Sequence, residues 1–158
     1  MWRTQSLAYP RWCYAYNTTA TLFNAEHQIW NLRRLDNLLT RTFRSNPIPG
    51  INRSALLLAG LFSFFSWHVE DELLPAVNYL HWGQPKVWYF IHPPFTQAFE
   101  TLLKRAYGID SDIGPCTNPF EHKIWLTDPN FLENNHIGYS RIIQHPGDYV
   151  IVWPQVWH

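Results

Sequence analysis

Residues 65–71 read FSWHVED and place an imidazole, His68, two positions before a carboxylate, Glu70. In an extended strand alternate side chains point to the same face, so these two can converge on one metal ion while Val69 turns away. With a third ligand from elsewhere in the chain they would form a facial triad, which leaves positions open on iron. Because a chain with eight histidines contains such pairs by chance, the surrounding sequence decides the interpretation.

The residues before this pair are almost entirely apolar from Ala55 to Trp67. This run predicts a buried strand, although periodicity alone does not separate it from a buried helix. Polar residues follow directly, with Asp71 and Glu72 after the pair. A solvated loop is the ordinary reading of such residues, but their place at the end of an apolar run favours a site at the mouth of a core.

Composition narrows the class of protein. A chain of 158 residues with 46% hydrophobic and 15% charged residues is long and apolar enough for one domain with a sizeable core. Twelve basic and twelve acidic residues cancel, which gives no support for direct nucleic-acid binding. The longest apolar run, residues 55–65, is too short to span a bilayer. Two cysteines, Cys13 and Cys116, favour a reducing compartment over a disulfide framework.

Periodicity and turn residues predict helices early in the chain and short strands later. The predicted helices are 24–43, 95–106 and 129–134. The predicted strands are 77–82 and 86–91, joined as a hairpin, followed by 123–127, 139–144 and 149–154. This order favours an antiparallel β-barrel or sandwich with added helices.

From residue 50 to residue 158 the chain resembles a Jumonji-C (JmjC) domain, the core of iron(II)- and 2-oxoglutarate-dependent histone lysine demethylases. The matching pieces are WHVED at 67–71, NYLHWGQPKVWY at 78–89, QHPGD at 144–148 and WPQVWH at 153–158. The resemblance implies a mainly β fold with helices (α+β), the cupin-like jelly roll called a double-stranded β-helix. Residues 1–49 would then form a loop and helix that pack on the core, and residues 50–158 the catalytic core.

The resemblance also implies a set of site residues. His68, Glu70 and His158 would be the iron ligands and the catalytic centre. Lys86, one of only three lysines, would pair with the far carboxylate of 2-oxoglutarate, although a lone lysine is more often a surface residue. The other residues of the co-substrate pocket would be Tyr14, Phe65, Asn78 and Trp88, of which the last three would ordinarily be read as core or strand-end residues.

Cys116 and His122 resemble half of a zinc site found in the subgroup of these demethylases that pairs a JmjN with a JmjC domain. Structural zinc usually has four ligands, and in that subgroup the other two lie beyond the last iron ligand. The alternative is a buried cysteine near an unrelated histidine. Because His158 directly follows a predicted core strand, we expect this chain to be a fragment, with the barrel incomplete at its C-terminal end.

The function implied by the resemblance is oxidative removal of a methyl group from lysine in a histone tail, as formaldehyde, in the nucleus. Ala55 and Leu57 stand where the family has groups that hold the methylated lysine, a task suited to aromatic faces and polar oxygens. Three alternatives therefore stay open. They are a JmjC hydroxylase of protein side chains, a non-catalytic chromatin-binding module, and a cupin-like protein with small-molecule chemistry.

Overall fold

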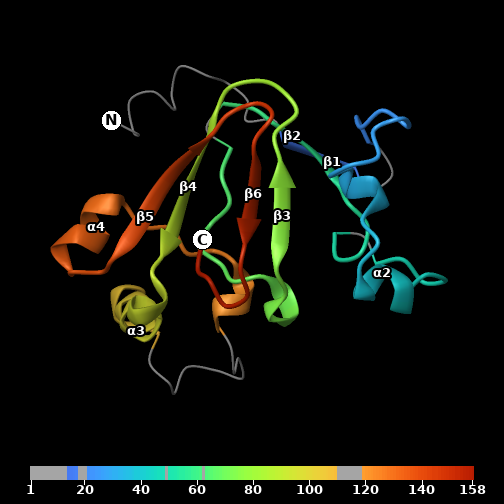
Figure 1. Ribbon diagram of the computed structural model, residues 1–158. Helices are drawn as coiled ribbons and strands as arrows, with labels where there is room; N and C mark the ends of the chain where they lie inside the picture. Colours follow the sequence, from blue (N-terminus) through green and yellow to red (C-terminus); the bar gives the residue numbers. More distant parts are fainter. Residues whose placement is uncertain (1–13, 18–20, 49, 62, 110–118) are drawn as a thin grey trace. The chain divides into compact units, whose positions relative to one another are not determined.

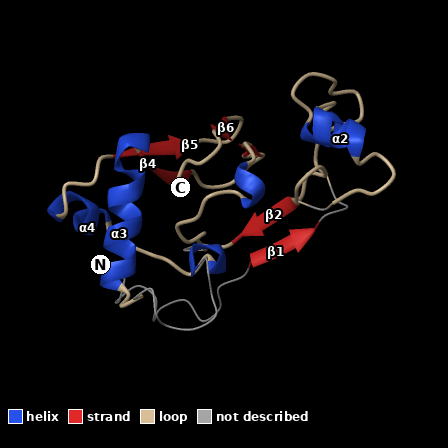
Figure 2. Cartoon of the chain, turned by 90° about the horizontal axis from the view of Figure 1, so that it is seen from below, coloured by secondary structure: helices blue, strands red, loops and turns tan. Residues whose placement is uncertain are grey.

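The computed structural model describes residues 14–17, 21–48, 50–61, 63–109 and 119–158. The chain divides into two compact units, residues 1–64 and 65–158. The predicted division into 1–49 and 50–158 stays a prediction. The strands and longer helices are, in chain order, β1 (Tyr14–Asn17), α2 (Leu38–Thr42), β2 (Leu56–Ala59), β3 (Ala76–Tyr79), β4 (Lys86–Ile91), α3 (Thr96–Ala106), α4 (Pro129–Asn134), β5 (Tyr139–Gln144) and β6 (Tyr149–Val152) (Figures 1 and 2).

In the first unit β1 and β2 form an antiparallel pair. The predicted helix 24–43 is wrong, because only a short 3-10 turn at Leu32–Arg34 and α2 are helical in this segment. Asparagine side chains interrupt it. Asn31 accepts a hydrogen bond from the Arg33 amide, and Asn37 and Thr40 form a capping box that begins a separate helix. Side chains of this kind offer the backbone an alternative to continuing a helix.

The predicted buried strand 55–67 is also wrong in its length and burial. Only β2 is a strand, and a turn in which Ser63 hydrogen-bonds to the Gly60 carbonyl follows it. Phe64 and Phe65 are 62% and 50% exposed. Trp67 is buried and forms a single antiparallel bridge with Trp125, which is all that remains of the predicted strand 123–127. Hydrophobic content alone therefore predicted a longer and more deeply buried strand than this segment forms.

In the second unit the strands pair antiparallel as β3 with β6 and as β4 with β5. The predicted hairpin between β3 and β4 is therefore wrong. The turns after β3 and after β5 hydrogen-bond to each other instead, since the Leu80 amide donates to the Asp148 carbonyl and the Gly147 amide to the Leu80 carbonyl. Each strand is thereby directed to a partner from the other half of the unit. The described residues form three two-stranded sheets and no closed barrel.

Helices α3 and α4 confirm the predicted helices 95–106 and 129–134. They lie beside the β4–β5 pair (Figure 1), and their apolar residues meet the end of β4 in one core. The buried members of this core are Trp67, Ile91, Phe99, Leu103, Trp125, Leu132, Ile137 and Trp157. None of the described helices is long and apolar enough to cross a membrane.

Phe99 of α3 has no exposed surface and lies between two tryptophans. Its ring contacts that of Trp67 edge to face, with centroids 5.2 Å apart, and that of Trp157 at 5.5 Å. Such aromatic contacts add to the free energy of apolar burial. Because each tryptophan directly precedes a histidine, this cluster fixes the backbone at His68 and His158.

We expect Phe99→Ala to lower the free energy of unfolding by about 3–5 kcal/mol, the usual cost of removing a buried aromatic ring. Urea unfolding followed by tryptophan fluorescence measures this change. Ile124→Ala is the control, because Ile124 is 66% exposed and its truncation should change the stability by less than about 0.5 kcal/mol. Equal effects of the two substitutions would contradict the account of the core.

Candidate metal centre

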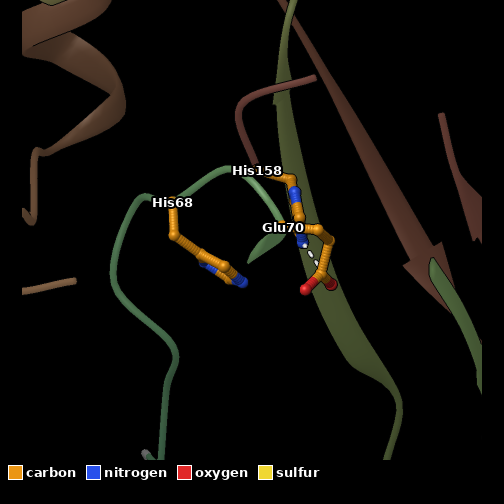
Figure 3. A group of neighbouring side chains, drawn as sticks. All are labelled: His68, Glu70 and His158. Atoms are coloured by element: carbon orange, nitrogen blue, oxygen red, sulfur yellow. Dashed lines mark ion pairs between the residues drawn. The ribbon is translucent and has the colours of Figure 1, made fainter. Parts of the chain in front are cut away.

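His68, Glu70 and His158 each offer one ligand atom, and these atoms lie within 4.8 Å of one another. Figure 3 shows the three side chains reaching toward a common region from two separate segments. The His158 Nε2 and Glu70 Oε1 atoms are 3.6 Å apart, and the two imidazole centroids are 4.3 Å apart. Within the described ranges, this is the one group of three or more such residues close enough to hold a metal ion.

The backbone brings the two histidines together. The His68 amide donates to the His158 carbonyl at 3.1 Å, and the His158 amide donates to the His68 carbonyl at 3.0 Å. Residues 68–70 are not assigned to a regular strand, but Glu70 has extended dihedral angles. Val69 packs against the core, so alternation places His68 and Glu70 on the other side. The spacing of two thus produces the predicted convergence.

Each histidine is also oriented by its own ring nitrogen. The Nδ1 atom of His68 lies 2.7 Å from the Ser66 carbonyl, and that of His158 lies 3.0 Å from the Val156 carbonyl. A carbonyl only accepts, so a neutral imidazole must carry its proton on Nδ1. The Nε2 lone pairs are then available to a metal, which is the usual arrangement of metal-binding histidines.

The tryptophans before the two histidines have polar anchors of their own. The Trp67 indole donates to the Thr127 hydroxyl at 2.7 Å, and the Trp157 indole donates to the Glu100 carboxylate at 3.0 Å. Both rings are buried, and a buried indole N–H normally finds a partner. These contacts join the site to α3 and to the residues before α4.

Burial and charge favour the metal-binding protonation states of two of these residues. The pKa of the His68 imidazole lies below its ordinary value. Burial is the main cause, and the neighbouring His158 is the second. Hydrogen bonding from the His158 imidazole, which requires that ring to be protonated on both nitrogens, lowers the pKa of the Glu70 carboxyl in the metal-free chain, and burial opposes this effect only in part. His68 is therefore held neutral and Glu70 ionised, which are the forms that ligate metals.

The donor set itself fits a divalent transition metal. Two imidazole nitrogens and one carboxylate oxygen are the ligands of the facial triad that holds non-haem iron(II) with coordination positions left open. Ligand atoms about 2.1 Å from a common ion lie roughly 3 Å apart, so metal binding would draw together the His158 and Glu70 atoms, now 3.6 Å apart, and the group as a whole, now within 4.8 Å. The residues present therefore fit the metal that the sequence predicted.

A cluster of one cation and aromatic rings adjoins this group along one face of β4. Alternate residues Lys86, Trp88 and Phe90 share that face. The Lys86 ammonium lies 4.7 Å from the centre of the Trp88 ring and 5.5 Å from that of Phe65. The rings of Trp88 and Phe90 each stack on His158 with centroids 6.2 Å away. Trp88 thus contacts both the lysine and the metal group.

Asn78 is the remaining predicted residue that the structure joins to the site. Asn78 on β3 is joined to Trp88 through Gln144, whose side-chain amide contacts both. The Tyr14 side chain and Cys116 lie outside the described residues, so their predicted roles stay predictions. His122 is exposed at the end of a 3-10 turn, Pro119–His122.

Several supporting residues escaped the sequence analysis. These are Trp67, Trp157, Thr127, Glu100 and Gln144. Residues 139–144, YSRIIQ, do not alternate between polar and apolar, so nothing local distinguishes Gln144 from an ordinary amide at a strand end. The indole partners lie 57 and 60 positions away along the chain, where sequence spacing carries no signal.

Comparison with known families decides the relationship of the chain. The family described as "JmjC domain, hydroxylase" matches residues 55–158, which include all three members of the candidate metal centre. The chain belongs to the JmjC domain family. The resemblance noted from the motifs at 67–71, 78–89, 144–148 and 153–158 is thereby confirmed.

Individual relatives of this JmjC chain are named as lysine demethylases. It is 35% identical over 133 residues to lysine-specific demethylase ELF6 of Arabidopsis thaliana, covering 82% of this chain and 10% of that protein. It is 32% identical over 147 residues to lysine-specific demethylase 4D of Rattus norvegicus, covering 92% and 28%. The probable lysine-specific demethylase 4F of Homo sapiens is 31% identical, covering 92% and 23%. The chain therefore spans less than a third of these relatives' lengths.

We expect His68→Ala to reduce the affinity for Co(II), a spectroscopic substitute for iron(II), by at least about tenfold, because a ligand of the triad is lost. Visible absorption titration under anaerobic conditions measures it. The matched control is His145→Ala, since His145 is exposed and its side chain lies outside the triad. Equal affinity in the two variants would remove His68 from the metal site.

The metal-free chain should lose stability as the pH falls below about 6.5. The pKa of His68 is lower in the folded chain than its ordinary value of 6.5, so the unfolded chain binds more protons in this range. This contribution is fully present above pH 6.5 and disappears as the pH falls through the folded pKa. Urea midpoints measured with a chelator between about pH 8 and pH 5 should fall less steeply in His68→Ala. An identical slope in parent and variant would contradict the assignment.

Proposed function

We propose that this JmjC chain is the core of an iron(II)- and 2-oxoglutarate-dependent dioxygenase of the lysine demethylase type. The observation that carries the proposal is the shared contact of Trp88 with Lys86 and with His158. It brings a cation suited to a dicarboxylate next to a group suited to iron. The relatives named as lysine-specific demethylases support the same class of reaction.

Iron(II), when bound by His68, Glu70 and His158, would supply with 2-oxoglutarate and oxygen the oxidising chemistry that hydroxylates a carbon. The triad supplies three ligands on one side and so leaves positions for the co-substrate. The protein's contribution is to orient the reactants and to exclude water around them. Trp88 and Phe90 contribute to that exclusion, because their rings cover one side of His158.

Lys86 is the proposed partner of the far carboxylate of 2-oxoglutarate. Among the described residues no carboxylate lies within ion-pair distance of its ammonium, which lies over the aromatic rings of Phe65 and Trp88. Burial lowers the pKa of Lys86. A partly buried charge without a counter-charge is costly, and a carboxylate bound there would offset that cost. Asn78 would add a polar contact, and Phe65 and Trp88 the walls.

Several finer points belong to the same proposal. We propose that the strands form part of a double-stranded β-helix. We propose that the substrate is a methylated lysine, as the names of its relatives suggest, that this lysine lies in a histone tail, and that the protein acts in the nucleus. The Tyr14 hydroxyl is proposed as a second contact to the co-substrate carboxylate. Cys116 and His122 are proposed as two ligands of a structural zinc site, completed by residues elsewhere.

A protein hydroxylase is the second candidate function. Ala55 and Leu57 occupy the positions where the resemblance places the residues that hold the methylated lysine. Aliphatic side chains lack the polar oxygens and aromatic faces that bind a methylammonium group. Both candidates use the same metal and co-substrate, so the mass of the product separates them. A hydroxylase adds one oxygen atom, whereas a demethylase removes one methylene equivalent as formaldehyde.

We expect Lys86→Met to weaken 2-oxoglutarate binding by about tenfold to a hundredfold, the range for a lost hydrogen bond to a charged group. Calorimetry with Mn(II) bound in place of iron measures it. Lys104→Met is the matched control, because that lysine also lies over a ring, Phe120, but is exposed on α3. Mn(II) affinity without 2-oxoglutarate should stay unchanged in both variants. Unaltered 2-oxoglutarate affinity in Lys86→Met would contradict the proposed pocket.

A further inference from the structure

Among the described residues of the second unit, Gln144 is the most completely buried polar residue, with 1% of its surface exposed. It ends β5, opposite Lys86 in the antiparallel register. Its side-chain amide contacts groups of three other segments, namely Trp88 on β4, Asn78 on β3 and the carbonyl of Asp148 in the turn before β6. A buried amide of this kind is costly unless each of its polar atoms has a partner.

The neighbours of Gln144 determine which way the oxygen and nitrogen of its side-chain amide face. The Trp88 indole is 2.9 Å from Gln144 Oε1, and an indole N–H can only donate. The oxygen of Gln144 must therefore face Trp88. Its nitrogen then faces the Asp148 carbonyl at 3.0 Å, the Asn78 carbonyl at 3.3 Å and Asn78 Oδ1 at 3.2 Å. One amide hydrogen serves Asp148, and the other is shared between the two oxygens of Asn78.

The hydrogen bonds from Trp88 to Gln144 and from Gln144 to Asn78 also determine the orientation of Asn78. Because the Gln144 nitrogen only donates, Asn78 must turn its own oxygen toward Gln144. The Asn78 Nδ2 group is left on the other side, where it can donate to an anion. A reversed Asn78 would present an acceptor to a carboxylate and would leave two donors facing each other. The direction of a single indole N–H thus fixes the donor offered by a residue on another strand.

We propose that Gln144 is a positioning residue that holds the amide of Asn78 in the orientation that donates to bound 2-oxoglutarate, with Trp88 as the group that fixes Gln144. The inference rests on the proposed function, since it concerns the same pocket. Gln144 does not itself touch the co-substrate in this scheme. It acts by excluding the wrong orientation of Asn78 before the co-substrate arrives, which is a form of preorganisation.

A double-mutant cycle tests the proposal, with 2-oxoglutarate affinity measured by calorimetry on the Mn(II)-loaded chain. Gln144→Met keeps the length of the side chain and removes both its donor and its acceptor. We expect it to weaken 2-oxoglutarate binding by about tenfold in the parent and by less than about threefold in an Asn78→Ala background. Mn(II) affinity without 2-oxoglutarate should change by less than about threefold, because the triad is untouched. An equal loss in both backgrounds, or no loss in the parent, would overturn the proposal.

A second variant covers the case in which Gln144→Met does not fold. Trp88→Phe keeps an aromatic ring over Lys86 and removes the indole donor that orients Gln144. It should weaken 2-oxoglutarate binding in the parent and much less in the Asn78→Ala background. The side-chain amide protons of Gln144 should exchange slowly with solvent in the parent and faster in Trp88→Phe, even without metal. Unchanged amide exchange and unchanged 2-oxoglutarate affinity in Trp88→Phe would contradict the proposal. A parent chain that binds Mn(II) but no 2-oxoglutarate would refute the proposed function and this inference with it.

Discussion

The paired backbone hydrogen bonds between His68 and His158 are the constraint on which the site depends. They join segments from opposite ends of the second unit and place two imidazoles side by side. Buried tryptophans precede both histidines, and Phe99 lies between them. The core is thus packed directly behind the metal group, so the free energy of apolar burial also holds the ligands in place. Convergence of the three side chains follows from this arrangement without a regular strand at residues 68–70.

Strand β4 provides the second support and links the metal group to the lysine and aromatic rings on its face. One face carries Lys86, Trp88 and Phe90, and its last residue, Ile91, lies in the core. Gln144 then connects this strand to β3, which belongs to the other sheet. A small number of polar contacts therefore joins the two strand pairs around the site. Buried polar groups that are all satisfied define a local structure more strictly than apolar packing alone.

The sequence predicted the parts whose signals are local. Periodicity and turn residues located α3, α4 and β5, and a spacing of two placed His68 and Glu70 on one side. Prediction from the sequence failed where side chains compete with the backbone hydrogen bonds of a helix, and where the structure depends on contacts between residues far apart in the chain. Asn31 and Asn37 divided a helix that the leucine spacing favoured, and exposed phenylalanines replaced an expected buried strand. The hairpin between β3 and β4 failed because the two turns bond to each other. Gln144 gained its role only through contacts with three distant segments.

The most direct test of the central claim is an anaerobic titration of the chain with iron(II) and 2-oxoglutarate, followed by visible absorption. A 2-oxoglutarate molecule chelating iron in the open positions of the triad gives a charge-transfer band that neither component gives alone. We predict that this band appears in the parent chain and is absent from His68→Ala. A parent chain that binds iron(II) yet develops no band with saturating 2-oxoglutarate would contradict the account of a joined metal and co-substrate site.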